Sequence, residues 1–435
     1  MTMNASQDHA NSNASSHNPI VNLLFLGLLA FMILFNGAVL WVAKDRVVAG
    51  YGDFAHFYAS ALIVRKGQGE KLYDYSTQKV VQHELFSQVE IRTEPMVFNH
   101  PAYETLIWVP LALLPYPAAI IVWTIINALM LSLLSLYLPR HLPCLRATFP
   151  LPWLLLMFAF YPVIIALIQG QDSIVLFGLY ALAFVSLRKD MPNLAGFILA
   201  FGLFKPHLVL PFVLIFLLNK QWQFVRAFVA SAIIPLSISV YITGWQGSID
   251  YIRFLLVSNR SLADIAHQAR YSIAPSAMPN LRGLFYLLLG GSIPESLILA
   301  MIGVSSVGLL AWTARLWRNG KIEAPLDWNF SVAIVVTMLV SYHLLAHDAV
   351  LLLLPMLILA NHLSAHNSCP QSRHWALGGA LIVLMVSPLY LILTAHGLLA
   401  LMTLLIIFLT GVISAEITWT PQASEGLTKD LIEAS

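Results

Sequence analysis

The chain has 435 residues, of which 59% are apolar and only 44 are charged, 23 basic and 21 acidic. Charged residues make up 10% of the chain, whereas a soluble domain carries about 25%, so a soluble globular protein is excluded. The net charge of +2 gives no indication of nucleic-acid binding. The composition therefore indicates a membrane protein that crosses the bilayer several times.

The two ends of the chain differ in composition from the part between them. Residues 1–19 are polar and carry one charge, which predicts a disordered tail, and residues 416–435 form a second tail. The apolar stretch from Ile20 to Val42 is too long for the core of a signal peptide and has no convincing cleavage site after it. We therefore expect an uncleaved first span and one membrane domain over residues 20–415.

The chain has about twelve apolar segments in all, which we count as candidate transmembrane segments. Lys and Arg residues cluster in alternate short loops, which the positive-inside rule assigns to the cytoplasm. Both termini are then cytoplasmic, as are Cys144 and Cys369, so we expect no structural disulfide. Two long loops, 43–116 and 244–294, lie outside. The segments after the first are 117–138, 150–169, 172–187, 193–204, 206–218, 223–243, 295–316, 329–346, 348–363, 375–394 and 396–415.

The two outer loops carry 21 of the 44 charged residues, and the first loop is patterned. Apolar residues recur from Phe54 to Leu62 at helical spacing, which predicts an amphipathic helix lying in the membrane interface. A second helix is expected near 77–89, and the apolar segment 102–114 is too short to span. Loop one is thus predicted to be a structured module on the outer surface.

Asp53 lies immediately before the first of these helices. An Asp at this position is typical of a helix N-cap, because its carboxylate accepts bonds from free backbone N–H groups. A carboxylate held near the lipid headgroups can also act as a general base, and the two roles are compatible. Asp45 and Asp74 are weaker candidates for the same chemistry.

Lys205 lies between two apolar halves that are each about a dozen residues long, roughly 18 Å as helix. A lysine within the bilayer costs about 2.5–3.5 kcal/mol, so it should face a cavity or an anionic partner. We expect Lys205, with His207 beside it, to bind a phosphate presented from the outer leaflet. The alternative is a complete hairpin from which the lysine extends to the outer surface.

Further polar groups lie near the predicted outer ends of spans. Asp172 either caps the following helix or binds polar substrate groups. His343 and His347, one turn apart and next to Asp348, could bind a metal, but no further ligand cluster is evident and contact with phosphate or hydroxyl is favoured. Arg282 precedes an apolar helix and is either an interfacial anchor or a phosphate clamp.

A surface carboxylate together with Lys205, Arg282 and His343 fits chemistry on a lipid-linked phosphate. The carboxylate would deprotonate an acceptor hydroxyl, and the cations would neutralise the departing phosphate. This chemistry needs no nucleotide, cofactor or metal, and we expect none. The chain contains no GxxxxGK[ST], GxGxxG or HExxH motif, which agrees with that expectation.

At these residues the sequence resembles glycosyltransferase family 87, the polyprenyl-phosphate-mannose-dependent mannosyltransferases and their relatives. The resemblance implies the GT-C membrane fold and an inverting sugar transfer, with Asp53 as base and Lys205 and His343 serving the donor phosphate. The sequence departs from the usual family residues at 100–102, Asp172 and 347–348. The matching segments, in order, are GDFAHFYASALIVRKGQGEKLYD, HPAYETLIWVPLALLP, IQGQDSIVLFGLYALAF, AGFILAFGLFKPHLVLPF, MPNLRGL and SYHLLAHDAVLLLLP.

We therefore expect a bacterial inner-membrane glycosyltransferase of the cell envelope with its active site on the extracytoplasmic face. Its partners would be a polyprenyl-phosphate-linked sugar, mannose or another hexose or pentose, and a lipid or glycan acceptor. The alternative is a transporter or flippase of polyprenyl-linked lipids, since many spans and a lysine at mid-depth also suit translocation. A third hypothesis is a non-catalytic scaffold for envelope assembly.

Overall fold

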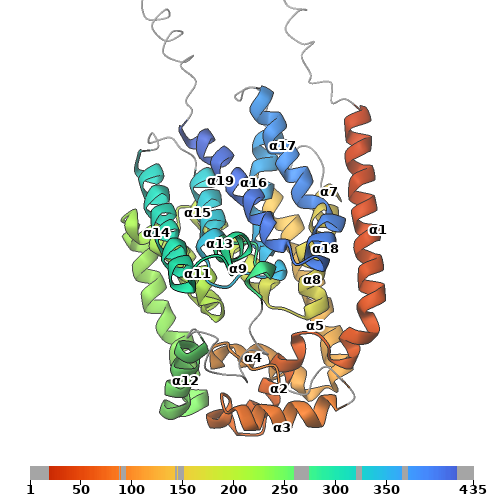
Figure 1. Ribbon diagram of the computed structural model, residues 1–435, viewed down its shortest axis with the longest axis vertical. Coiled ribbons are helices and arrows are strands. Elements are labelled where there is room, and N and C mark those ends of the chain that lie inside the picture. Colours follow the sequence, from red (N-terminus) through yellow and green to blue (C-terminus); the bar gives the residue numbers. More distant parts are fainter. Residues whose placement is uncertain are drawn as a thin grey trace, which may run out of the picture.

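The computed structural model describes residues 19–87, 95–142, 151–258, 274–319, 326–364 and 371–418, together with Val89 and Leu145. Every regular element in these ranges is a helix. Long helices form a bundle, and a layer of shorter helices closes one end of it (Figure 1). With its many apolar helices, the chain is a helical membrane protein, as its composition predicted.

Within the described residues, the bundle contains five helical segments that are long and apolar enough to cross a membrane, and a sixth if a pair bent by 62° is one span. Five further apolar helices have 10–17 residues, so the predicted count of twelve spans is not confirmed. The helices of the bundle are α1 (Pro19–Ala49), α5 (Tyr116–Tyr137), α7 (Leu151–Ala159), α8 (Tyr161–Gln169), α9 (Ser173–Arg188), α10 (Pro192–Ala200), α11 (Pro206–Leu218), α12 (Trp222–Ser258), α13 (Leu281–Leu289), α14 (Glu295–Asn319), α15 (Leu326–Val340), α16 (Leu353–Ser364), α17 (Gln371–Met385), α18 (Ser387–Ala395) and α19 (Met402–Thr418).

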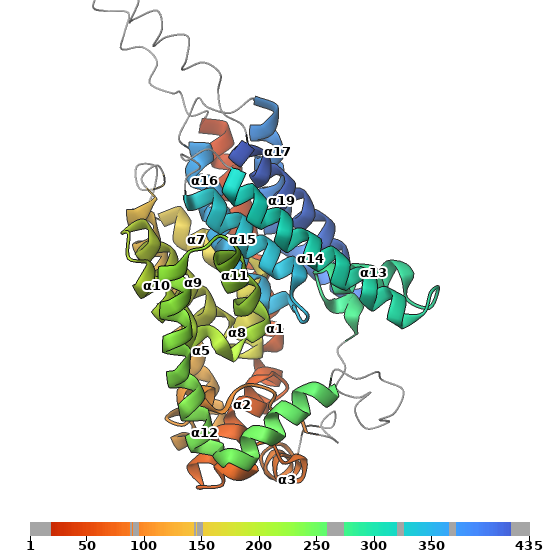
Figure 2. The same ribbon diagram turned by 90° about the vertical axis from the view of Figure 1, so that its left-hand side faces the viewer.

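The end layer is formed mainly by residues of loop one. It contains α2 (Phe54–Arg65), α3 (Tyr75–Phe86) and α4 (Thr105–Trp108), with the short 3-10 helices η1 (Gly69–Lys71), η2 (Ala102–Glu104) and η3 (Leu111–Leu113). The second half of α12 joins it after a break at Gly244, where φ is +66° (Figure 2). The stacking of Tyr73 on Tyr251, at 4.8 Å between ring centroids, holds α12 against this layer.

The helix α2 differs from the amphipathic surface helix predicted there. Every residue from Phe54 to Ala61 is buried, so protein covers both of its faces. On one face, Phe57 stacks on Trp108 with 4.7 Å between the ring centroids, and Trp108 meets Trp123 of α5. The aromatic residues of loop one therefore form a core of their own, and α2 is a rigid internal support.

The helix boundaries show where the sequence patterns were informative. The first span is a helix, but it continues through the charged residues 44–46 to Ala49. The chain breaks at Lys205, between the 3-10 helix η5 (Phe201–Phe204) and α11, as Pro206 predicts. Residues 1–18 and 419–435, Cys144 and Cys369 lie outside the described residues, so the predicted tails and the absence of a disulfide stay predictions.

Candidate active site

The turn between α8 and α9 is the centre of the candidate site. Gly170 ends α8 in the left-handed conformation, with φ of +64°, and a Cβ there would lie 2.6 Å from the Cβ of Phe54. Only glycine meets both demands without strain. The turn places Gln171, Asp172 and Ser173 against the module on one side and the bundle on the other.

Asp53 lies at the first end of α2 but does not cap it through its side chain. Its Oδ2 instead accepts a hydrogen bond of 2.6 Å from Nε2 of Gln171, and its backbone N–H donates to Oε1 of Gln169 at 3.1 Å. The carboxylate is half-buried. Asp74 does act as a helix cap, but of α3, where its carboxylate accepts a hydrogen bond from the backbone N–H of Thr77. Asp45 is exposed and pairs with Lys44.

Lys205 is only 3% exposed and does not reach the surface of the protein. Its ammonium group lies 2.7 Å from Oδ1 of Asp172 and 2.6 Å from Oδ1 of Asp348, and it donates to Oγ of Ser173 at 2.7 Å. Asp172 is an ion-pair partner, and the three hydrogen bonds of the ammonium group go to Asp348, Ser173 and Gln171. A longer contact of 3.4 Å reaches Oε1 of Gln171. The predicted anionic partners of the lysine are therefore carboxylates of the protein itself.

The late histidines lie near this lysine. Asp348 belongs to the 3-10 helix η8 (Ala346–Leu352), and its Oδ1 lies 3.6 Å from Nε2 of His347. His343 and His207 meet edge to face, with 5.8 Å between their ring centroids. Burial lowers the pKa of His343 to about 4, so its imidazole is neutral near pH 7 and can donate one hydrogen bond.

Arg282 packs against Tyr342, the residue that precedes His343. Its guanidinium group is 4.1 Å from the centroid of the Tyr342 ring, and Nη1 donates to the Tyr342 carbonyl at 3.3 Å. Nε of Arg282 is buried and makes no hydrogen bond. The structure thus brings Lys205, Asp348 and the histidines together, and places Arg282 against Tyr342, the residue before His343.

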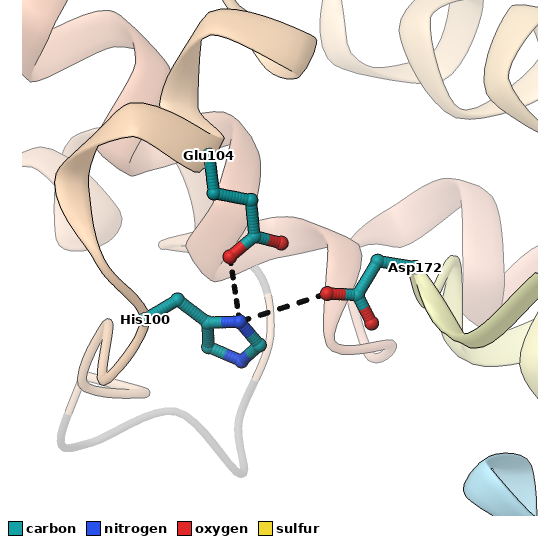
Figure 3. A group of neighbouring side chains, drawn as sticks. All are labelled: His100, Glu104 and Asp172. Carbon is teal, nitrogen blue, oxygen red and sulfur yellow. Dashed lines mark ion pairs between the residues drawn. The ribbon is translucent and has the colours of Figure 1, made fainter. Parts of the chain in front are cut away.

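Two residues of the site were missed by the sequence reasoning. His100, two residues before η2, and Glu104, its last residue, point toward Asp172 (Figure 3). Nδ1 of His100 lies 2.6 Å from Oε2 of Glu104 and 3.6 Å from Oδ2 of Asp172. Their signal was the HPAYE segment, a polar pair at i, i+4 spacing inside an apolar run. Gln171 was visible in the turn, but nothing indicated its bond to Asp53.

Burial sets the ionisation of this group. It lowers the pKa of His100 to about 4, so the imidazole is neutral near pH 7. Burial and the charge of Asp172 raise the pKa of Glu104 well above its usual range. Burial also acts to raise the pKa of Asp172, but the positive charge of Lys205 outweighs it and brings that pKa below its usual range. Asp172 and Lys205 are therefore a charged pair.

A comparison with known families matches residues 98–342, more than half of the chain, to glycosyltransferase family 87. The chain belongs to glycosyltransferase family 87. This confirms the family that the motifs suggested, and the protein is a glycosyltransferase. The matched region of this family 87 protein includes His100, Glu104, Asp172, Lys205 and Arg282, whereas Asp53 lies before it and His343 after it.

No curated protein matches the chain, and no solved structure matches it. The GT-C arrangement of this family 87 member therefore stays a prediction.

Proposed function

We propose that this protein transfers a sugar, mannose or another hexose or pentose, from a polyprenyl-phosphate donor to a lipid or glycan acceptor, with inversion at the anomeric carbon. The observation that carries the proposal is the bridge made by Gln171. Its Nε2 binds the carboxylate of Asp53 and its Oε1 faces the ammonium group of Lys205. A half-buried carboxylate and a cationic group are thus fixed relative to each other by one amide.

The reaction assigns a role to each of these groups. Asp53 takes the proton of the acceptor hydroxyl as that oxygen attacks the anomeric carbon. The bond between this carbon and the phosphate oxygen breaks, and polyprenyl phosphate leaves with its negative charge. Cationic and N–H groups around the departing phosphate lower the barrier.

The phosphate would meet the group of residues around His343. Arg282 has a buried Nε without a hydrogen bond, and a guanidinium group suits phosphate oxygens. Neutral His343, with His207 and His347 nearby, offers N–H donors. Lys205 can exchange its bond to the neutral hydroxyl of Ser173 for one to a phosphate oxygen, and keep both carboxylates as partners.

The arrangement of the helices supports a site on the extracytoplasmic face of a bacterial inner membrane. The start of α1 and the end of α19 lie at one end of the bundle, and α2, α3 and α4 lie at the other (Figure 1). Short loops rich in Lys and Arg are expected at the first of these ends. The module that carries Asp53 would then face outward.

The proposal is tested by sugar transfer with purified protein in detergent. Polyprenyl-phosphate sugars are supplied as donors with lipid and glycan acceptors, and the glycosylated product is measured. Asp53→Asn removes the base and keeps the side-chain size, so kcat should fall by about 10²–10⁴-fold. Asp45→Asn, which changes an exposed carboxylate of the same loop, should leave kcat unchanged.

Two results would contradict the proposal. Undiminished transfer by Asp53→Asn removes Asp53 from the role of base. Movement of a labelled polyprenyl lipid across proteoliposomes, with no covalent product under any donor and acceptor combination, favours the transporter hypothesis instead.

A further inference from the structure

The surroundings of Lys205 contain more buried negative charge than the lysine can balance. Glu104 and Asp172 are fully buried and Asp348 is 1% exposed. Lys205 supplies one positive charge to Asp172 and Asp348, and Glu104 adds a third carboxylate. Ionisation of Glu104 as well would leave the three carboxylates with two negative charges more than Lys205 balances, and without a further cation the raised pKa of Glu104 keeps a proton on it. A buried charge without a counter-charge is costly, so a further positive charge is expected here.

The geometry shows where that charge would lie. Ligand atoms of His100, Glu104 and Asp172 all lie within 4.8 Å of one another, and the three side chains converge (Figure 3). Nδ1 of His100 and both carboxylate oxygens of Glu104 are buried atoms, and Nδ1 lies 2.6 Å from Oε2. These buried polar atoms therefore face a shared space.

Asp172 divides its two oxygens between two partners. Oδ1 faces Lys205 at 2.7 Å, whereas Oδ2 faces His100 at 3.6 Å. The lysine therefore does not compete for the oxygen that faces His100 and Glu104. A carboxylate can bind a different cation with each of its two oxygens.

We propose that His100, Glu104 and Asp172 form a binding site for one divalent cation. The donor set is one neutral imidazole nitrogen and two carboxylate oxygens, which suits a hard or borderline ion such as Mn²⁺. Two positive charges equal the surplus of the three carboxylates over Lys205. A proton shared between His100 and Glu104 is the rival account, but it balances only one of the two charges.

The role of the ion in transfer rests on the proposed function, whereas its binding does not. Lys205 is already held by two carboxylates, so it contributes little net positive charge to a departing phosphate. A divalent cation joined to Lys205 through Asp172 would make the whole group neutral and allow it to accept an anionic leaving group.

The binding site is tested by titrating Mn²⁺ into the chelator-treated, detergent-purified protein and recording the loss of free Mn²⁺ by electron paramagnetic resonance. We expect one Mn²⁺ per chain. His100→Ala and Glu104→Gln should each weaken binding by more than about tenfold, since even residues that only support metal ligands contribute 10- to 100-fold. His83→Ala and Glu84→Gln are matched controls on exposed positions of α3 and should bind Mn²⁺ like the parent protein.

Gel filtration and thermal unfolding establish that each variant is folded; because His100 is partly exposed and Glu104→Gln keeps its shape, we expect both to fold. If the parent protein binds no Mn²⁺, the proposal is overturned, and a proton shared between His100 and Glu104 is the remaining explanation. Equal binding by the site variants and the controls also overturns it. Sugar transfer by a protein that binds no Mn²⁺ would overturn the metal site and keep the proposed function. Mn²⁺ binding by a protein that transfers no sugar would keep the metal site and contradict the proposed function.

Discussion

At the scale of single residues, the candidate site is organised by Gln171. Its amide is the link between the partly accessible carboxylate of Asp53 and the buried charges around Lys205. The residue performs no chemistry in the proposed mechanism. It fixes the direction of the carboxylate, because its amide N–H binds one of the two carboxylate oxygens.

Replacing Gln171 by Leu tests this positioning role. A hydrogen bond to a charged group contributes about 1.5–3 kcal/mol, so kcat should fall by roughly 10- to 100-fold, with a smaller change in the KM of the donor. Initial rates over a range of donor concentrations separate the two parameters. Gln246→Leu, on the exposed second half of α12, is the control and should not alter either. A variant with normal kcat would show that Asp53 is held by other groups.

The residue scale also shows what the sequence could and could not predict about the site. Asp53 was proposed because it precedes a helix near the membrane surface, and Lys205 and His343 were proposed singly from their places in or beside apolar segments. Their partners were not, because pairing depends on the fold: Gln171 is 118 residues from Asp53, and Asp348 is 143 residues from Lys205. Two separate hypotheses, a phosphate-binding lysine and a histidine pair, are in fact one connected group.

At the scale of helices, apolar stretches and prolines predicted most of the elements, including the break at Pro206. They could not predict which helices complete a crossing, since length alone does not separate a short span from a helix that enters and returns. They also misplaced α2, because its helical periodicity continues through polar residues that turn out to be buried.

The contact between α10 and α12 depends on a glycine. A Cβ at Gly196 would lie 2.2 Å from the carbonyl oxygen of Phe224, so the two backbones approach as only small residues allow. Gly196→Ala should therefore lower the free energy of unfolding by about 1–3 kcal/mol, seen as a lower midpoint of thermal unfolding in detergent. Gly303→Ala on α14, where a Cβ meets no atom within 4 Å, should have no such effect. A stable Gly196→Ala protein would mean that the helices can move apart freely.

The cap of α3 makes a prediction about pH. The hydrogen bond from Thr77 lowers the pKa of Asp74, so the folded state favours the carboxylate. This contribution is present above the unfolded pKa and is lost as the pH falls through the lowered folded value. Asp74→Ala should reduce stability by about 1 kcal/mol near neutral pH. In chemical unfolding of the parent and variant, the difference should disappear in acid; a difference that persists there would assign it to packing.

At the scale of the whole molecule, the chain separates its chemistry from its anchoring. The apolar bundle holds the helices, while the module of α2, α3 and α4 closes one end and presents Asp53 (Figures 1 and 2). The aromatic core of the module, which Trp123 of α5 completes, supports the helix α2 that follows Asp53. The site lies where the module meets the bundle.

The proposed orientation can be measured with a membrane-impermeant thiol reagent. Glu84→Cys lies on an exposed part of α3 and should be labelled in intact cells. Cys144 and Cys369, expected in the cytoplasm, should react only after the membrane is opened, so they serve as internal controls. Labelling of the native cysteines in intact cells, without labelling of Glu84→Cys, would show that the protein has the opposite orientation.

The pairing of Lys205 with Asp348 also constrains how the protein is made. The ribosome adds 143 residues between the two, which takes roughly 7–30 s at ordinary rates of synthesis. During that interval the lysine has Asp172 but lacks its second carboxylate. The candidate site is therefore among the last parts of the molecule to form, and a chain that ends before residue 348 keeps the pair of Lys205 and Asp172 but lacks the carboxylate of Asp348.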